Sequence, residues 1–445
     1  MIKQQIETIV IGAGWAGLGL SHALAEAGLS HRVLERGRIG ETWLTQRWDS
    51  FYLNTPKLHS VMPGDRYDGP DPEGFYTRDE FVALLEDYAG RNRLPVATNT
   101  PVTALTRDGK AGTYRLITPF GELTARAVVI ASGSLNRARR PEVARVFPPG
   151  LLQIDASDYR SPDALPEGAV LVVGSAQSGG QIAEDLAMAG RVVFLSTGRN
   201  GRKPRRYRGR DVVFWERESG LYDIPRKDFV GPDGRIPGRP LVGARQTISL
   251  QSLSAQGVVL LGRLIGIADG RLIFADDVCE NIRLGDEGSA NTRQHIDDYI
   301  ARHGIDAPPA TDDPAETVAP RLPTPPILSL DPNEHDLTTV IWCTGFEGDY
   351  SFVQVPGVLD LRGQPLESEG LTEAPGIYFA GVDFSSTRKS GTIAGIAEEA
   401  QRLVGHIVAR RRKSLARVHE SEGGPSRTSV DEGRMSAVEG IDLHS

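Results

Sequence analysis

A glycine-rich turn directly after a short apolar strand is the feature that most limits what this chain can fold into. Residues 6–11 (IETIVI) are mostly apolar and β-branched, and GAGWAG follows at once with Gly12, Gly14 and Gly17. In such a strand–turn–helix unit the first glycine permits the sharp turn, the second lets the backbone approach a diphosphate, and the third allows close helix–strand packing. A second strand ends in Glu35, about 20 residues further on, where a carboxylate can bind ribose hydroxyls.

A second unit of the same kind begins about one domain length later. Residues 169–173 (AVLVV) form an apolar run, and GSAQSG follows with Gly174, Ser178 and Gly179. Ala176 replaces the middle glycine, and its small side chain still permits a close approach to a phosphate. Two such units together are more informative than either alone. The sequence therefore predicts an α/β fold with two Rossmann-like dinucleotide-binding domains.

The residues after the second strand of each unit distinguish the two nucleotides. Glu35 suits FAD, whose adenosine ribose keeps a free 2′-hydroxyl. The second unit has Thr197 at the corresponding position, and a basic stretch at 199–210 begins with Arg199. A small hydroxyl beside an arginine accommodates a 2′-phosphate that an acid would repel, so NADPH is favoured over NADH. Most charges of the stretch are interpreted as a solvated loop, and only Arg199 and Thr197 are assigned to the phosphate.

Composition excludes several other classes of protein. The net charge of the 445 residues is −8, which disfavours nucleic acid as a partner. No apolar run approaches the ~20 residues of a membrane helix. The N-terminus enters its first strand without room for a secretion signal, so a cytoplasmic protein is expected. Two cysteines, Cys279 and Cys343, exclude a disulfide framework, and the nine histidines show no metal motif.

The rest of the chain predicts an NADPH domain inserted into an FAD domain. Residues 112–123 alternate like a hairpin, 127–133 form a buried strand of the first sheet, and 137–141 leave it as a linker strand. Strands at 338–346 and 376–383 return to the FAD part. The expected domains are 1–165 (FAD, first part), 166–325 (NADPH, irregular over 232–326), 326–410 (FAD, second part) and a disordered tail at 411–445.

The strand at 376–383 ends in a candidate cofactor ligand. Asp383 precedes Gly391 and a predicted helix that extends to about residue 410. A turn of this kind can present a carboxylate and helix N–H groups to the ribityl–phosphate chain of a flavin. Asp383 is therefore predicted to bind FAD.

Four motifs in this order resemble those of the class B flavin-dependent monooxygenases, the group of flavin-containing monooxygenases, N-hydroxylases and Baeyer–Villiger enzymes. They are GAGWAG, GETW at 40–43, GSAQSG, and VIWCTGF at 340–346. The similarity spans nearly everything up to residue 410. It implies FAD and NADPH as cofactors, and it implies that Trp43, in the segment similar to the family's GGTW, lies at the FAD site.

One segment carries a candidate catalytic residue. Residues 48–57 (WDSFYLNTPK) resemble the family stretch TNSSKE, whose asparagine lies over the flavin. The resemblance places that residue at Asn54 and implies that its amide helps to hold NADP+ and the C4a-(hydro)peroxyflavin. A neutral amide can donate to a peroxide oxygen and accept from a nicotinamide without supplying an acid. The alternative is an asparagine that serves the turn before Thr55 and Pro56.

A further family fingerprint, FxGxxxHxxx(Y/F), is incomplete before the second glycine turn. It would end at Tyr159, with Asp155 in place of its histidine and Leu151 in place of its glycine. The Baeyer–Villiger version ends in Trp, so a tyrosine favours the other subgroups.

The function that the resemblance implies is oxygenation of a nucleophilic nitrogen or sulfur of a small molecule, with NADPH and O2, through a C4a-hydroperoxyflavin. The cofactors supply the redox chemistry, so no protein nucleophile or metal is needed. Baeyer–Villiger oxygenation of a ketone is one alternative. The other is an FAD- and NADPH-binding redox protein that oxygenates nothing.

Overall fold

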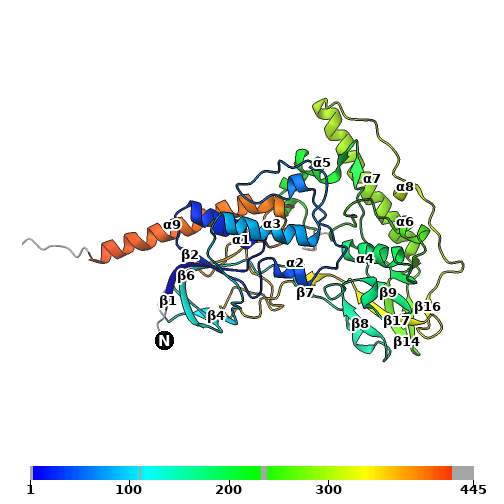
Figure 1. Ribbon diagram of the computed structural model, residues 1–445, viewed down its shortest axis with the longest axis horizontal. Coiled ribbons are helices and arrows are strands. Elements are labelled where there is room, and N and C mark those ends of the chain that lie inside the picture. Colours follow the sequence, from blue (N-terminus) through cyan, green and yellow to red (C-terminus); the bar gives the residue numbers. More distant parts are fainter. Residues whose placement is uncertain (1–3, 110–111, 232–237, 423–445) are drawn as a thin grey trace, which may run out of the picture. The chain divides into compact units, whose positions relative to one another are not determined.

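The computed structural model describes residues 4–109, 112–231 and 238–422 (Figure 1). It divides into two compact units, and the second begins at Gly405, within helix α9 (Ile396–Glu422). The first unit contains every strand of the described residues. The strands form two large sheets with parallel strands at their centres and three smaller sheets, which confirms the predicted α/β class. No helix in the described ranges is both long enough and apolar enough to cross a membrane.

The first sheet is built around the apolar run that opens the chain. β1 (Gln4–Ile11) pairs in parallel with β2 (His31–Leu34) and with β6 (Gly121–Ile130). The strand order is β3-β2-β1-β6-β5-β4, and β19 (Ile377–Phe379) also pairs in parallel with the end of β6. β5 and β6 form the predicted antiparallel hairpin. The remaining strands are β3 (Val96–Ala97), β4 (Ala104–Arg107) and β5 (Tyr114–Thr118).

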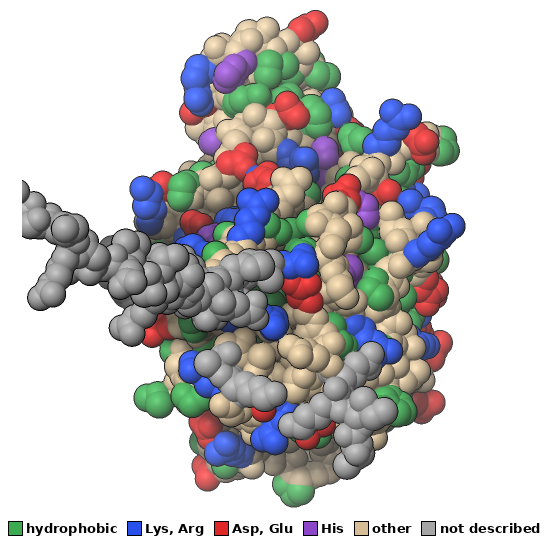
Figure 2. Space-filling view, turned by 90° about the vertical axis from the view of Figure 1, so that its left-hand side faces the viewer, with side chains coloured by type: hydrophobic (Ala, Val, Ile, Leu, Met, Phe, Trp, Pro, Cys, Tyr) green, Lys and Arg blue, Asp and Glu red, His purple; other side chains and the backbone are tan. Residues whose placement is uncertain are grey.

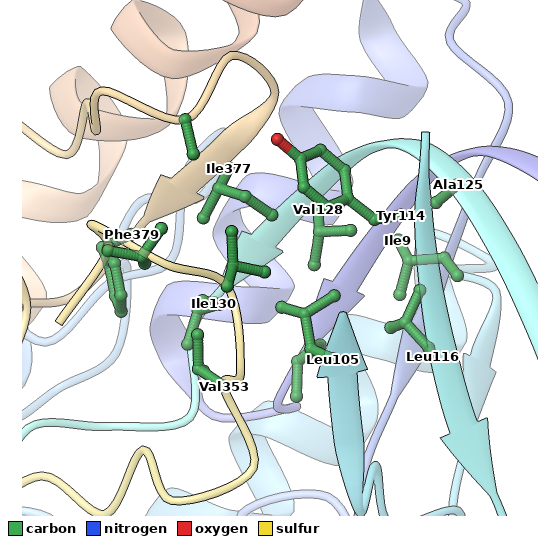
Figure 3. Close-up of a cluster of buried hydrophobic side chains, with 14 of the residues drawn as sticks. Ile9, Leu105, Tyr114, Leu116, Ala125, Val128, Ile130, Val353, Ile377 and Phe379 are labelled. Atoms are coloured by element: carbon green, nitrogen blue, oxygen red, sulfur yellow. The ribbon is translucent and has the colours of Figure 1, made fainter. Parts of the chain in front are cut away.

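One apolar core joins this N-terminal sheet to a segment from near the end of the first unit (Figure 3). Ile9 from β1 and Val128 and Ile130 from β6 pack with Ile377 and Phe379 from β19. All five side chains are almost completely buried. Burial of an aliphatic or aromatic side chain stabilises by about 1.5–3 kcal/mol. The core therefore holds β19, and the turn that follows it, against the first sheet.

The second sheet has five parallel strands in the order β13-β10-β9-β17-β8. The boundaries predicted at 165/166 and 325/326 would divide it, because β8 and β17 belong to this sheet and not to the first. Apolar strands have the same sequence pattern whichever sheet they join, so only their pairing decides. The strands are β8 (Leu152–Asp155), β9 (Ala169–Val173), β10 (Val193–Ser196), β13 (Val259–Leu261) and β17 (Leu337–Trp342).

The chain crosses between the two sheets twice, and the two crossings pair with each other. β7 (Arg137–Ala138) leads from the first sheet to the second, and β18 (Phe346–Glu347) leads back, antiparallel to it. The predicted linker strand is therefore present as a two-residue strand. In Figure 1, β7 and α2 (Glu41–Thr45) lie between the two sheets.

Two helical segments differ from the predictions. The region expected to be irregular contains α7 (Val278–His303), whose buried face includes Asn281, Gly285 and Ser289. These small or polar residues, spaced four apart, give no apolar periodicity, which is why the helix was missed. α9 continues through 411–422, where disorder was expected, and 423–445 lie outside the described residues.

The remaining elements complete the two layers of helices and the smaller sheets. α1 and α3 contact each other, and Figure 1 places both on one face of the first sheet. The remaining helices and strands are α1 (Trp15–Glu26), α3 (Arg78–Arg91), α4 (Gln177–Met188), α5 (Val212–Glu218), α6 (Leu250–Ala255), α8 (Pro314–Thr317), β11 (Arg206–Tyr207), β12 (Arg210–Asp211), β14 (Leu264–Ala268), β15 (Arg271–Phe274) and β16 (Ser329–Leu330).

Charges on the visible surface are mixed in sign. On the face drawn in Figure 2, Lys and Arg side chains are interspersed with Asp and Glu. Nucleic-acid binding requires a continuous basic face. The described residues of this face show no such continuous patch.

Candidate active site between two glycine turns

One cavity of about 1030 Å³ lies where the two sheets meet. Its wall contains residues that directly follow β1, β6 and β19 of the first sheet and β9 and β17 of the second. Ligands of parallel sheets bind beyond the carboxyl ends of the strands. The volume is at the upper end of the range for ligand pockets, so it suits a large ligand.

The first glycine turn reserves space for close backbone packing and for a ligand. A Cβ at Gly12, which has φ +109°, would lie 2.4 Å from the carbonyl oxygen of Ala131. A Cβ at Gly17 would lie 1.9 Å from the carbonyl oxygen of Gly12. A Cβ at Gly14 would meet nothing within 4 Å, and this residue caps α1 without a side-chain hydrogen bond. The N–H groups of the helix start are thus open to an anion from the cavity.

Glu35 directly follows β2 and lies at the cavity wall. Its buried carboxylate accepts hydrogen bonds from the backbone N–H of Ala13 (2.7 Å) and of Gly37 (3.0 Å). These bonds fix the carboxylate beside the glycine turn. Each carboxylate oxygen has a second lone pair, so Glu35 can still accept from a ribose hydroxyl.

Two tryptophans form the wall next to the first turn. Trp43, in α2, lies 5.8 Å from Trp15 between ring centroids, and both line the cavity. The indole N–H of Trp15 and the hydroxyl of Ser132 are buried at this wall and have no hydrogen-bond partner in the described chain. Buried donors are normally satisfied, so a polar cofactor fits this part of the cavity.

Asp383 follows β19 and lines the same cavity. Its Oδ1 lies 2.9 Å from Nη2 of Arg239. Burial raises the pKa of the Asp383 carboxyl, and Arg239 opposes this shift. A Cβ at Gly391, which has φ +74°, would lie 2.3 Å from the same Oδ1, so the carboxylate packs directly against the backbone. Sequence reasoning did not identify Arg239.

The second glycine turn repeats the packing of the first. A Cβ at Gly174 (φ +104°) would lie 2.5 Å from the carbonyl oxygen of Cys343, and one at Gly179 would lie 1.8 Å from that of Gly174. Ala176 caps α4 at the position of the open glycine, and Ser178 lines the cavity. The strand–turn–helix geometry predicted for both units is therefore present.

The structure separates the two residues predicted to bind a 2′-phosphate. The Thr197 hydroxyl is buried, donates to the carbonyl of Leu261 (2.8 Å) and accepts from Nδ2 of Asn281 (3.0 Å). It holds α7 against β10 and cannot face a phosphate, so this prediction is wrong. Arg199 is exposed, and its guanidinium lies 3.7 Å from Glu280, where an incoming phosphate can reach it.

The basic stretch at 199–210 is not a solvated loop. Arg202 and Arg205 are buried, and all seven basic residues have an acidic partner within 4.0 Å. An unpaired charge is costly to bury, and most of the acids that pair these charges come from segments that the sequence does not associate with the stretch. The partners are Glu280 for Arg199, Asp286 and Glu316 for Arg202, Glu216 for Lys203, Asp211 for Arg205, Glu73 for Arg206 and Arg210, and Asp297 for Arg208.

Asn54 lies in the cavity wall and its side chain contacts the second domain. Its Oδ1 accepts from Nε2 of Gln181 (2.8 Å), and its Nδ2 donates to Oε1 of Gln177 (3.3 Å). Both glutamines belong to the first two turns of α4. The buried guanidinium of Arg205 donates to the backbone carbonyl of Asn54 (3.0 Å). Sequence reasoning found Asn54 but missed Gln177, Gln181 and Arg205.

A second contact ties the segment before Asn54 to α4. Asp185 accepts from the hydroxyl of Ser50 (2.6 Å) through Oδ1 and from the hydroxyl of Tyr159 (2.6 Å) through Oδ2. Tyr159 is fully buried. Its place at the end of the incomplete fingerprint therefore has a structural use, while Asp155 pairs with Arg140 (2.6 Å).

A buried acid lies beneath the turn that carries Asp383. Glu399, in the first turn of α9, accepts from the backbone N–H of Gly381 (3.1 Å). Burial raises the pKa of Glu399 to about 7. The thiol of Cys343, at the other side of the cavity, also has its pKa raised by burial, which makes it unreactive.

Two glycine turns on parallel strands around one cavity define a class, the oxidoreductases that use a flavin and a pyridine nucleotide. The pyridine nucleotide-disulphide oxidoreductase family matches residues 9–213. A CzcO-like oxidoreductase of Geobacillus kaustophilus is 30% identical over 406 residues, which cover 91% of this chain and 98% of that protein. The chain belongs to this family of flavin-dependent oxidoreductases.

Other proteins are similar over part of the chain or in fold. The indole-3-pyruvate monooxygenase YUCCA1 of Oryza sativa is 30% identical over 187 residues, 41% of this chain and 45% of that protein. A flavin-containing monooxygenase from Stenotrophomonas maltophilia has a TM-score of 0.61 at 19% identity, covering 92% of this chain and 99% of that chain. The bacillithiol disulfide reductase of Staphylococcus aureus has a TM-score of 0.57 at 13% identity, with 92% and 99% covered. The two structures share this fold.

Proposed function

We propose that the protein is an NADPH- and O2-dependent flavoprotein monooxygenase that oxygenates a nucleophilic nitrogen or sulfur of a small molecule. The observation that carries this proposal is the neutral carboxamide of Asn54, held in the shared cavity by two glutamines of the second domain. The names of two similar proteins, the YUCCA1 monooxygenase and the Stenotrophomonas monooxygenase, support the same reaction type.

The two cofactors are assigned to the two turns. FAD is held with its diphosphate at the start of α1, where Gly14 leaves the approach open, and NADPH at the start of α4. The residues proposed for FAD are Gly12, Gly14, Gly17, Glu35, Trp43 and Asp383, and those for NADPH are Gly174, Ser178, Gly179 and Arg199.

The residues of the chain bind and orient the cofactors, and they exclude water from the cavity. FAD, once reduced by NADPH, supplies the activation of O2 and the transfer of one oxygen atom. Trp43, Trp48 and Phe51 give the cavity an apolar wall, which keeps water from the reacting groups. Asn54 offers a donor and an acceptor at fixed positions and carries no acidic proton.

The test measures where the oxygen goes. Protein reconstituted with FAD is reduced with NADPH or NADH under anaerobic conditions and then mixed with O2 and panels of amines, sulfides and ketones. We expect faster reduction by NADPH, N- or S-oxygenated product, and little H2O2 per NADPH consumed. Lactones or esters from the ketones would establish the Baeyer–Villiger alternative. Stoichiometric H2O2 with every panel would establish a redox protein that oxygenates nothing.

A further inference from the structure

Arg47 is a cation in the cavity wall that no acid of the described chain neutralises. Its guanidinium carbon lies 5.2 Å from the ring centroid of Trp43 and 5.8 Å from that of Phe51. Its Nη1 donates to the carbonyl of Gln46 (2.7 Å), and no carboxylate in the described ranges lies within 4.0 Å. Burial lowers the pKa of Arg47 to about 10, which is still far above neutral pH, so the guanidinium is charged at neutral pH.

The other arginines of this cavity are either paired or in water. Arg239 pairs with Asp383, while Arg36 and Arg139 are exposed and their charges are stabilised by solvent. Arg47 is half-buried between two aromatic rings, and it has neither an acidic partner among the described residues nor full exposure to water. A partly desolvated charge without a partner is costly, and an anion that enters the cavity would offset that cost.

The diphosphate of FAD has a separate receptor. The start of α1, at Gly14 and Trp15, presents free backbone N–H groups to the cavity. The ring of Trp15 contacts the ring of Trp43, against which the guanidinium of Arg47 also lies, and the same guanidinium lies near the ring of Phe51, in the segment that leads to Asn54. Phe51 precedes Asn54 by three residues and both line the cavity, so the guanidinium lies beside the segment that carries Asn54, where a substrate would approach.

We propose that Arg47 receives the carboxylate of the substrate, an aromatic or otherwise apolar acid that also carries the nucleophilic nitrogen or sulfur. A guanidinium binds a carboxylate through two parallel N–H···O bonds. Trp43, Trp48 and Phe51 supply an apolar wall for the body of the acid. This inference rests on the proposed function, since it places the substrate at the site assigned to FAD and Asn54.

The experiment compares acids with their neutral amides. Phenylacetate, 3-phenylpropanoate and indole-3-acetate are titrated against phenylacetamide, 3-phenylpropanamide and indole-3-acetamide, using wild-type protein, Arg47→Met and Arg139→Met. Binding is followed through the flavin absorbance and, independently of any flavin, through tryptophan fluorescence. FAD content and affinity of each variant are measured as well. Arg139→Met is the matched control because it removes an exposed charge from the same cavity.

We expect wild-type protein and Arg139→Met to prefer each acid over its amide by about tenfold or more, and Arg47→Met to show no preference while it keeps FAD. Equal binding of acids and amides by wild-type protein would overturn the proposal, as would a preference that survives in Arg47→Met. Loss of FAD from Arg47→Met would assign the guanidinium to the diphosphate and also overturn it.

One further variant and the fluorescence readout make each outcome of the experiment interpretable. If Arg47→Met does not fold, Arg47→Lys keeps the charge but not the planar fork, and we expect acid binding to weaken several-fold while amide binding stays unchanged. Equal changes for both would contradict the proposal. The fluorescence titration needs no oxygenation, so failure of the proposed monooxygenase reaction and failure of acid recognition are separate results.

Discussion

Asn54 shows how a single side chain depends on both halves of the molecule. The chain brings it to the cavity on a segment of the first domain, yet both ends of its amide are hydrogen-bonded to α4, through Gln177 and Gln181. Because each glutamine can act as donor or acceptor, only the pair together fixes which way the amide of Asn54 points. Its orientation is therefore a property of the contact between the domains.

At this residue scale, we expect Asn54→Ala to lower the oxygenated product formed per NADPH by about tenfold or more, with a matching rise in H2O2. The reason is the loss of the polar group that we propose to face the reacting centre. The exposed Asn333 provides the control, since Asn333→Ala removes the same group outside the cavity. Product and H2O2 are quantified together, and an unchanged ratio would remove Asn54 from the mechanism.

At the scale of elements, the two strand–turn–helix units owe their shape to glycines with different tasks. Gly17 and Gly179 lie so close to the backbone of the preceding turn that no side chain fits. A Cβ at Gly14 would meet nothing within 4 Å, and this residue lines the cavity where we propose that FAD binds. Folding and binding can therefore be separated within one motif.

We expect Gly17→Ala to lower the free energy of unfolding by about 3 kcal/mol or more, because its Cβ would lie 1.9 Å from the carbonyl oxygen of Gly12. Gly14→Ala should change that free energy by only about 1 kcal/mol, yet weaken FAD binding about tenfold or more. Urea denaturation and FAD titration measure the two effects. Tight FAD binding by Gly14→Ala would place the diphosphate elsewhere.

The contact between α9 and the turn after β19 should make stability depend on pH. The pKa of Glu399 rises from 4.5 to about 7 on folding because its carboxyl is buried. The folded state therefore holds the proton more tightly, and the stability present below pH 4.5 is lost as pH rises through 7. The full loss is roughly 3 kcal/mol.

Glu399→Gln keeps an acceptor for Gly381 but cannot ionise. We expect the wild-type protein to lose roughly 3 kcal/mol more than this variant between pH 4.5 and pH 8, as measured by urea denaturation. Other titrating groups are common to both proteins and cancel in the comparison. Parallel pH profiles would show that the carboxyl is not desolvated as the structure indicates.

At the scale of the whole molecule, two sheets share one cavity because a few contacts hold them together. β7 and β18 pair where the chain crosses. Asp185 of α4 binds Ser50 from the first part of the chain and Tyr159 from the connection before β9. In the proposed reaction, the transfer of hydride from NADPH to FAD requires the two cofactors at a fixed separation, so these contacts should bear on the rate of reduction.

We expect Asp185→Ala to lower the free energy of unfolding by about 1–3 kcal/mol, since the buried hydroxyl of Tyr159 loses its acceptor. Anaerobic reduction of FAD by NADPH should also slow, while FAD affinity stays unchanged. Ser50→Ala is the graded control, because its bond to Asp185 is exposed and should matter less. Reduction at the wild-type rate in Asp185→Ala would show that this contact does not position the cofactors.

The sequence alone determined the two glycine turns, the strands around them and the carboxylate at Glu35, because these depend on local sterics and on a fixed order along the chain. It also placed Asn54 and Asp383 at the cavity. It assigned β8 and β17 to the wrong sheet, and it missed α7, whose buried residues are small and polar.

Only the tertiary structure decided which charges are paired and which are not. It buried Arg202 against Glu316, turned Thr197 inward, and left Arg47 without an acidic partner among the described residues. A charge is stabilised or not by groups from distant parts of the chain, and no spacing within a motif records where those groups will lie.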